Sequence, residues 1–390
     1  MKSIISFTIA LLIASFSYGQ YSINEALAEI ETNNPTIMAL QAQAQSAKAE
    51  GRVGLAPPNP EFELGRFPAM DGAGIKSAWG VSQHFEFPTV YSKRMQLVKS
   101  NDLLVDNSYN SLRQSTLLDA KMIILELIHN RRVLAEYKQR EAFAKSMLQV
   151  VQKKVDAGQS SVIDLNNARL RVAEAIQNQR EIENSIYILK QKIRVYNGGK
   201  DINLSDTTLI LVDLANESEL TNRFISLDPR FKLFEQMVDN AEKQKSLAVH
   251  QGLPDLTIGY ESEKTSAEHF VGFRAGISIP LWGNTGNRRA ATSKLSASRV
   301  EYQSQKQLLE LEYKEFFLKA QNTKLRLDEL KQAHASFSNI ALLKKAVELG
   351  QISVIDFFNE VTFLYGITDR IFELEIEYAI LNAHLHRFEL

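Results

Sequence analysis

Residues 155–170 read VDAGQSSVIDLNNARL, and residues 347–362 read VELGQISVIDFFNEVT. The two stretches lie 192 positions apart and share eight of sixteen residues, where chance would give about one. The identical pairs are Val155/Val347, Gly158/Gly350, Gln159/Gln351, Ser161/Ser353, Val162/Val354, Ile163/Ile355, Asp164/Asp356 and Asn167/Asn359. Each copy has helical sequence on both sides and a lone glycine before small polar residues, a pattern typical of a helix that ends, turns and restarts. The sequence therefore predicts two helical hairpin tips, at 155–165 and 347–357.

The segments around the tips also occur twice. Asn33-Asn34-Pro35 corresponds to Leu227-Asp228-Pro229, 194 positions later, and each marks a helix interruption. Proline- and glycine-containing breaks then lead into two segments of alternating polar and apolar residues, which predict β-hairpins at 60–87 and 255–280. We therefore expect an internal duplication, with a first repeat over 21–205 and a second over 206–390, each with the order helix, strand, strand, long helix, tip, helix.

Two helices are predicted to be much longer than a globular core requires. Residues 91–157 and 287–349 contain neither proline nor glycine, and the first of these segments has apolar pairs at helical spacing. At 1.5 Å per residue, each would span about 100 Å. The helices before the strands and after the tips are about half as long, so two of them stacked end to end match one long helix. The predicted fold is mainly α with a small β part, a rod with strands at one end and tips at the other.

The predicted strands have one apolar face. Trp79, Val81, Phe85 and Phe87 alternate with small or polar residues, as expected for a membrane β-barrel and equally for a strand half-buried in a soluble sandwich. Four strands in one chain cannot close a barrel in lipid, because open edges would leave backbone groups unpaired. Three chains would supply about twelve strands, enough for a barrel with a water-filled interior. This closure argument favours a symmetric trimer.

The first twenty residues are typical of a secretory signal peptide. Lys2 precedes an apolar run from Ile4 to Phe16, and small residues follow at 17 and 19. Beyond residue 20 no apolar stretch approaches the roughly eighteen residues that a membrane-spanning helix needs. Any contact with a membrane would then be made through the strands.

Composition excludes several classes of function. The chain has no cysteine, which excludes disulfides and thiolate chemistry, and its 45 basic and 46 acidic residues are spread along the chain. The sequence shows no nucleic-acid-binding patch, no metal-ligand cluster, no Ser/His/Asp spacing and no phosphate-binding loop. We therefore predict a protein that is not an enzyme and has no cofactor and no metal site.

These features together resemble the TolC-like outer-membrane efflux proteins, over essentially the whole chain after the signal. The resemblance is carried by the two Asn-Pro or Asp-Pro helices, two hairpins, two long helices and two Gly-x5-Asp tips in tandem. Residues 58–62, 82–86 and 93–94 resemble the branch that serves heavy-metal and cation efflux pumps.

The resemblance implies a homotrimer in the outer membrane that extends into the periplasm, with a twelve-stranded β-barrel in the lipid and an α-helical barrel below it. It also implies a periplasmic adaptor and an inner-membrane pump, commonly of the resistance-nodulation-division type. The protein would then be a passive exit duct of a tripartite efflux system, with metal cations as a candidate cargo. Alternatives are a duct for drugs or other small molecules, a type I secretion duct, or a soluble periplasmic coiled-coil adaptor.

The resemblance also suggests roles for the tips. Gly158, Gln159, Gly350 and Gln351 match the tips on which adaptor hairpins dock. Asp356 matches the first of two aspartates that ring the closed periplasmic aperture, and Asn359 stands where the family often has the second.

Helical geometry is compatible with an aperture role, because residues at i and i+3 share a helix face. Asp356 and Asn359 can therefore point together toward a pore axis, where three symmetry copies of a carboxylate favour cations. Asp164 is the equivalent aperture candidate in the first copy. A local alternative stays open, in which Asp164 and Asp356 cap helix N-termini.

Overall fold

The computed structural model of the chain describes residues 21–70, 74–206, 208–337 and 340–390. The predicted signal peptide, 1–20, lies outside the described residues. Among the described residues, helices dominate and four strands form one antiparallel sheet, which confirms the predicted mainly helical fold class. The elements are α1 (Ile23–Asn33), α2 (Pro35–Glu50), β1 (Glu61–Pro68), β2 (Ile75–Phe85), α3 (Pro88–Asp156), α4 (Val162–Tyr196), α5 (Glu217–Leu227), α6 (Pro229–His250), β3 (Asp255–Lys264), β4 (His269–Ser278), α7 (Thr285–Phe337), α8 (Ile340–Glu348), α9 (Val354–Leu385) and the 3₁₀ helix η1 (Arg387–Glu389).

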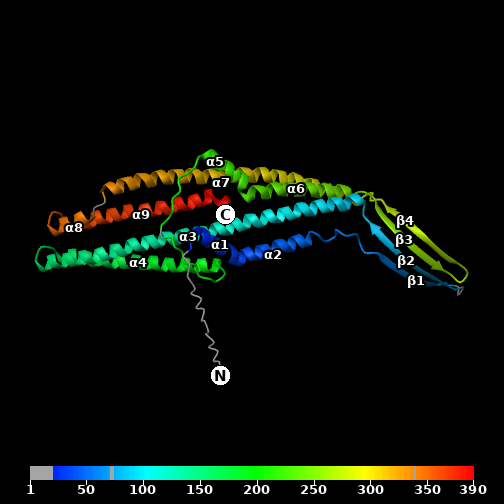
Figure 1. The fold of residues 1–390 in the computed structure, drawn as a ribbon, viewed down its shortest axis with the longest axis horizontal. Helices are drawn as coiled ribbons and strands as arrows, with labels where there is room; N and C mark the ends of the chain where they lie inside the picture. Colours follow the sequence, from blue (N-terminus) through cyan, green and yellow to red (C-terminus); the bar gives the residue numbers. More distant parts are fainter. Residues whose placement is uncertain (1–20, 71–73, 207, 338–339) are drawn as a thin grey trace, which may run out of the picture. The chain divides into compact units, whose positions relative to one another are not determined.

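The order of elements from α1 to α4 recurs from α5 to α9, as Figure 1 shows along the colour gradient. The two strand pairs fall within the ranges predicted for the hairpins, and the strands are longer than the alternating sequence alone indicates. The sequence predicts a single helix over 287–349. The described residues of this range are helical in α7, which ends at Phe337, and in α8, which begins at Ile340, and residues 338–339 between them lie outside the described residues.

Each repeat has a helix break before a proline. Asn34 and Asp228 adopt extended backbone conformations, with ψ of 119° and 120°, and α2 and α6 begin at the following proline. Extended backbone is expected at these positions, since the ring of a proline disfavours helical conformation in the residue before it. The Asp228 side chain also accepts a hydrogen bond from the Arg230 N–H and so caps α6.

The chain divides into two compact units that each draw on both repeats. The tip unit comprises the described residues of Met1–Asn34, Ala120–Ile210 and Ser338–Phe372. The sheet unit comprises those of Pro35–Asp119, Leu211–Phe337 and Glu373–Leu390.

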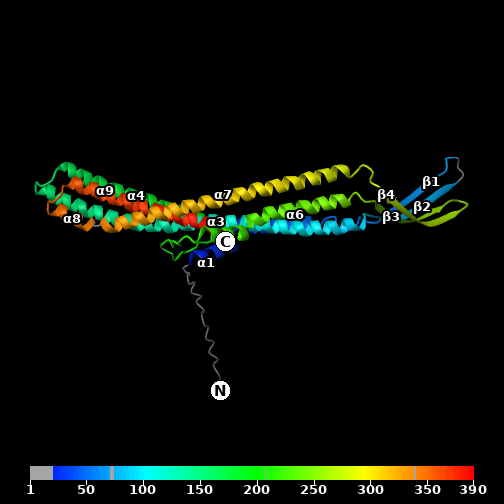
Figure 2. The same ribbon diagram turned by 90° about the horizontal axis from the view of Figure 1, so that it is seen from above.

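In the sheet unit the strands pair in the order β1-β2-β3-β4 (Figures 1 and 2). The central pairing joins the two hairpins, with Val81 opposite Tyr260 and Gln83 opposite Ile258. Among the described strands, β1 and β4 therefore each have a neighbour on one side only. A buried cluster in the same unit packs α5, α6, α7, α9 and η1 together; its fully buried members include Leu220, Phe224, Ala320, Tyr378 and Leu385.

None of the described helices combines the length and the apolar character needed to cross a membrane.

Candidate functional site

The two tips have the same backbone geometry. Gly158 and Gly350 have φ of 69° and 74°, in the left-handed region that favours glycine. The Gln159 N–H donates to the Lys154 carbonyl at 2.8 Å, and the Gln351 N–H donates to the Ala346 carbonyl at 2.8 Å. With the shorter-range bonds from the two glycine N–H groups, these contacts form Schellman motifs that satisfy the last carbonyls of α3 and α8.

After each glycine, a serine and an aspartate start the next helix. In the first tip, the Asp164 N–H donates to Ser161 Oγ at 3.1 Å, and the Asp164 carboxylate accepts from the Ser161 N–H at 3.0 Å. The Ser160 and Ser161 hydroxyls donate to the same carboxylate at 2.8 Å each. This capping box lowers the pKa of Asp164, chiefly through the Ser161 N–H and then through the two hydroxyls.

The second tip has a simpler version of this cap. The Asp356 N–H donates to Ser353 Oγ at 3.0 Å, and the Ser353 hydroxyl donates to the Asp356 carboxylate at 2.6 Å. Asp356 and Asn359 are exposed, whereas Asp164 is half-buried. Local capping thus accounts for the glycine, serine and aspartate identities of the repeated stretch, and it leaves the Asp356 carboxylate more accessible than that of Asp164.

Both tips pack against one hydrophobic cluster in the tip unit, so the structure brings the predicted tip residues of the two repeats into one region. Figure 1 shows the chain reversing between α3 and α4 and again between α8 and α9. The buried members of the cluster come from all four helices and are Met147, Val151, Leu165, Ala168, Val347, Val354, Phe357 and Val361.

An ion pair that the sequence analysis did not identify joins α3 to α9 in the tip unit. Arg140 donates to both carboxylate oxygens of Asp369, at 2.9 and 2.7 Å, and to Glu136 at 3.0 Å. Its guanidinium lies 4.2 Å from the ring centroid of Tyr365. Burial disfavours the charged form of Arg140, but the bonds to Asp369 and Glu136 outweigh this effect and raise its pKa. A sequence signal existed, since Arg140 interrupts a helical stripe that includes Tyr137, Ala144 and Met147.

A cleft of about 250 Å³ lies beside this ion pair, between α3, α4 and α9. Aromatic side chains line much of it, and Arg171 and Glu174 of α4 lie at its polar edge. Burial raises the pKa of Tyr365, one of the lining residues, to about 12. The tyrosine is therefore neutral throughout the physiological range.

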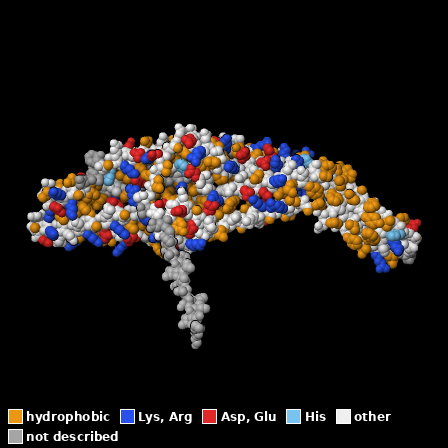
Figure 3. All heavy atoms as spheres, viewed as in Figure 1, with side chains coloured by type: hydrophobic (Ala, Val, Ile, Leu, Met, Phe, Trp, Pro, Cys, Tyr) orange, Lys and Arg blue, Asp and Glu red, His pale blue; other side chains and the backbone are white. Residues whose placement is uncertain are grey.

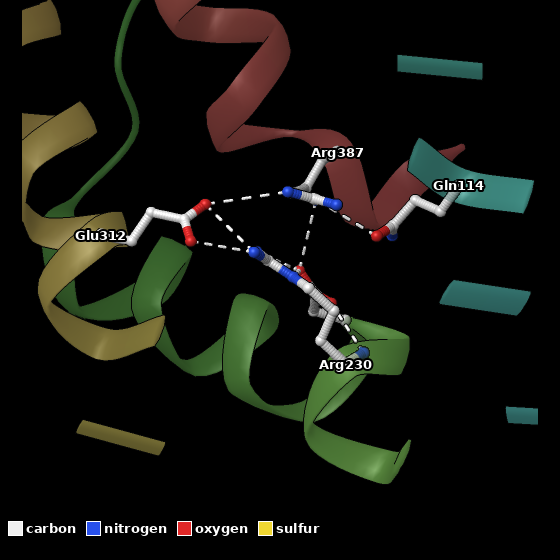
Figure 4. A network of polar contacts seen from close by, with 5 residues as sticks. Gln114, Arg230, Glu312 and Arg387 are labelled. Carbon is white, nitrogen blue, oxygen red and sulfur yellow. Dashed lines mark hydrogen bonds and ion pairs between the residues drawn. The ribbon is translucent and has the colours of Figure 1, made fainter. Parts of the chain in front are cut away.

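The sheet unit contains a second buried ionic network, shown in Figure 4. Arg230 donates to Asp228 at 2.9 Å through Nη2 and to the Glu312 carboxylate at 3.0 and 3.1 Å through Nη1. Arg387 of η1 lies 3.6 Å from Asp228 and 3.7 Å from Glu312, and it donates to Gln114 at 3.2 Å. The Asp228 side chain is 0% exposed. The network connects α3, α6, α7 and η1, and its role is structural.

The two faces of the sheet differ in chemistry. The strand register places Phe62, Trp79, Val81, Ile258 and Phe273 on one face, and Figure 3 shows hydrophobic side chains gathered over the strands. Several of these side chains are highly exposed, as in Phe273 at 89%. Trp79, Tyr260 and Phe273 form a row of aromatic contacts across three strands, with centroid distances of 5.7 and 5.4 Å.

The opposite face carries small and charged residues. Gly80 pairs with Glu63 on one side and with Glu261 on the other, and Arg274 of β4 donates to Glu261 at 2.7 Å. An exposed apolar face of this kind on a two-faced sheet is typical of contact with lipid or with another protein.

The described residues contain no group of three or more His, Cys, Asp or Glu side chains that could hold a metal ion.

Comparison with known proteins gives a clear result at the level of structure. Neither a scan of protein-family models nor a search of curated proteins finds a match. The fold is similar to that of CusC, studied for transmembrane channel formation, with 15% identity, coverage of 95% of this chain and 92% of that chain, and a TM-score of 0.80. The Campylobacter jejuni CmeC outer membrane channel matches with 13% identity, 94% and 85% coverage and a TM-score of 0.76. The outer-membrane channel OprN matches with 13% identity, 94% and 89% coverage and a TM-score of 0.77.

These similarities extend over nearly the whole described chain, and at such low identity they establish its fold. The chain has the fold of the outer-membrane channel proteins, as its resemblance to the TolC-like family implied.

Proposed function

We propose that the protein is the outer-membrane exit duct of an efflux system, which passively conducts cargo delivered from the inner membrane. The observation that carries the proposal is the four-stranded sheet, with one exposed apolar face, one polar face and a single neighbour for each of β1 and β4. Lipid on the apolar face and further strands at the two edges would satisfy such a sheet, because in a bilayer an open edge leaves backbone groups unpaired. Similarity to solved outer-membrane channels supports the same conclusion.

The duct is a homotrimer. The described residues of each chain contribute four strands, so three chains contribute about twelve and remove every open edge. The apolar face, which includes Phe62, Trp79 and Phe273, contacts outer-membrane lipid, and the face with Glu63, Glu261 and Arg274 lines the water-filled interior. The two repeats, 21–205 and 206–390, each supply one hairpin and one helical tip.

The tips form the periplasmic end of the duct. Asp356 is the main gate residue, with Asn359 on the same face of α9, because both are exposed and Asp356 has few capping bonds. Asp164 has a minor part, since Ser160 and Ser161 already bind its carboxylate. Three copies of Asp356 around an aperture would favour cations and repel anions.

The tip turns are also the docking points for a periplasmic adaptor. The four residues Gly158, Gln159, Gly350 and Gln351 present similar backbone shapes in the two repeats. Two similar surfaces per chain offer an adaptor six related positions around a trimer. The inner-membrane partner is a pump of the resistance-nodulation-division type.

The proposed cargo is a metal cation. This proposal rests on the resemblance of residues 58–62, 82–86 and 93–94 to the heavy-metal branch and on the accessible Asp356 carboxylate. Export of drugs or other small molecules, or type I secretion, would use the same architecture with different partners. Deletion of the gene, followed by growth with metal salts, dyes or bile salts, separates these cargo classes.

The experiment that tests the duct is purification of the full chain from outer-membrane fractions and its insertion into planar lipid bilayers. We expect a trimer on gels that dissociates on heating, and discrete single-channel currents. Release as a soluble monomer with no channel activity would contradict the duct and favour a periplasmic coiled-coil adaptor.

Matched variants make this test specific. Phe273→Arg places a charge on the apolar face and should impair membrane insertion, because an arginine that faces lipid costs about 2–4 kcal/mol at the bilayer midplane. Arg274→Asp changes the neighbouring position on the opposite face and should still give a trimer. Equal insertion of the two variants would contradict the assignment of the apolar face to lipid.

A further inference from the structure

The cleft in the tip unit has a size that restricts its occupant. Its volume is about 250 Å³, whereas three turns of an α-helix about 10 Å across occupy on the order of 1000 Å³. A helical segment of a partner protein therefore does not fit inside it. A molecule of about two fused aromatic rings does.

Aromatic side chains line the cleft on two helices. Phe143 of α3 and Phe358 and Tyr365 of α9 are half-buried lining residues. Phe357, at the base of the cleft, is fully buried and contacts both Phe143 and Phe358, with centroid distances of 6.0 and 5.4 Å. These contacts hold the rings of the cleft in place. Rigid aromatic walls favour a planar ring through offset-stacked and edge-to-face contacts, each worth about 0.5–1.5 kcal/mol.

Gly366 has no packing reason to be glycine. It lies within α9, its φ is not positive, and no atom outside its own stretch of helix lies within 4 Å of the position that a Cβ would occupy. Glycine inside a helix costs about 1 kcal/mol relative to alanine. Because Gly366 lines the cleft, the missing side chain leaves α9 open to close approach by a bound molecule.

The charges of the cleft are already paired. Arg140 is bound by Asp369 at 2.7 and 2.9 Å, and Arg171 donates to Glu174 at 3.1 Å. A charged ligand would lose its hydration in the cleft. The charged lining groups named above already have partners of opposite charge, so they would not compensate for that loss. The cleft therefore favours an uncharged molecule.

We propose that the cleft between α3, α4 and α9 is a binding site for an uncharged planar aromatic molecule of about two fused rings, which stacks between Phe358 and Tyr365 over Gly366. Binding can be measured without transport, although the use of nanodiscs rests on the proposed membrane location. A chain that does not insert into nanodiscs would contradict that location and not the binding site, and the same measurement is then made on the chain in solution.

The test is ¹⁹F NMR of 6-fluoro-2-naphthol with the full chain in lipid nanodiscs, with empty nanodiscs as background. We expect saturable line broadening that unlabelled 2-naphthol displaces. Naphthalene-2-sulfonate, its charged analogue, should bind at least tenfold more weakly. Broadening equal to that of empty nanodiscs, or equal affinity for the sulfonate, would overturn the proposal.

Two variants locate the site. Gly366→Phe fills the cleft and should weaken binding at least tenfold, whereas Ala173→Phe, an exposed position on α4 outside the lining, should leave affinity unchanged. Phe358→Leu removes one aromatic wall without adding bulk and should weaken binding about fivefold, so the test holds even if Gly366→Phe disturbs folding. Wild-type affinity in folded Gly366→Phe or in Phe358→Leu would place the bound naphthol elsewhere and overturn the assignment.

Discussion

Arg387 of η1 lies 3.6 Å from the carboxylate of Asp228, the residue at the break between α5 and α6. The first repeat has a neutral equivalent of this contact, in which the Asn34 side chain donates to the Tyr196 carbonyl at 2.8 Å. Both contacts link a helix break to the end of the helix that follows the tip of the same repeat. The duplicated positions thus have the same structural role with different chemistry.

We predict that exchanging these two residues destabilises the protein at both positions. Asn34→Asp would place a carboxylate against a carbonyl oxygen at a buried position, and Asp228→Asn would remove the charge of one of the two carboxylates that lie beside Arg230 and Arg387. Each change should reduce the free energy of unfolding by about 3 kcal/mol. Thermal unfolding followed by circular dichroism measures the effect. An exposed Asp201→Asn change serves as a control, and stability equal to wild type in Asn34→Asp would contradict the role of this contact.

Alanine substitution at the tip glycines should destabilise the protein, because the backbone at these positions has a positive φ. Gly158→Ala and Gly350→Ala each force an L-residue into the left-handed region, at about 1–2 kcal/mol, although no atom lies within 4 Å of the added Cβ. Gly366→Ala is the matched control, since its helical backbone predicts a gain of about 1 kcal/mol. Chemical denaturation monitored by circular dichroism shows whether each substitution lowers or raises the free energy of unfolding. Stabilisation by Gly158→Ala would show that its φ is not retained in solution.

The capping box at the first tip predicts that the stability of the folded protein depends on pH. The folded-state pKa of Asp164 is lowered from its ordinary value of 3.8. The ionised carboxylate therefore stabilises the folded protein fully above that value, and this stabilisation is lost as the pH falls through the lowered folded-state pKa. Asp164→Asn should cost about 1 kcal/mol at neutral pH. The difference in melting temperature between wild type and variant should shrink below about pH 4. A difference that stays constant down to pH 2 would contradict the ionised cap.

Arg140 should hold α9 against α3. Arg140→Met leaves Asp369 without its bidentate partner, and hydrogen–deuterium exchange of residues 360–372 should accelerate by at least tenfold, equivalent to about 1.4 kcal/mol or more of lost local stability. Arg140→Lys should give an intermediate rate, because lysine keeps the charge but not the planar fork. Lys145→Met, which breaks a surface pair with Glu141 on the same helix, is the control. Unchanged exchange in Arg140→Met would show that the ion pair does not stabilise α9.

The proposed gate is tested at Asp356. Asp356→Ala removes three carboxylates from a trimer, and we expect higher single-channel conductance and weaker cation selectivity in planar bilayers. Asn359→Asp adds a carboxylate one helical turn further along and should strengthen cation selectivity. Glu181→Gln, which removes an exposed carboxylate on α4 away from the tip, serves as a control. Unchanged conductance and selectivity in Asp356→Ala would contradict the aperture role.

The sequence by itself determined the features that depend on neighbours along the chain. The tips, the breaks at Asn34 and Asp228 and the alternation of the strands were all predictable, because glycine φ, proline sterics and capping act over three to five residues. The sequence left open whether Asp164 and Asp356 cap helix N-termini. The Asp164 carboxylate accepts the Ser161 N–H and so caps α4, whereas at the second tip Ser353 accepts the Asp356 N–H and donates its hydroxyl to the Asp356 carboxylate.

Only the tertiary structure decided which distant charges meet. Arg140 and Asp369 are 229 residues apart, and Arg387 and Gln114 are 273 apart. No local pattern determines such pairs, because they depend on which helix faces pack together. The same reason explains why the pairing of β2 with β3 and the cleft beside Gly366 were found only once the helices and strands were placed in space.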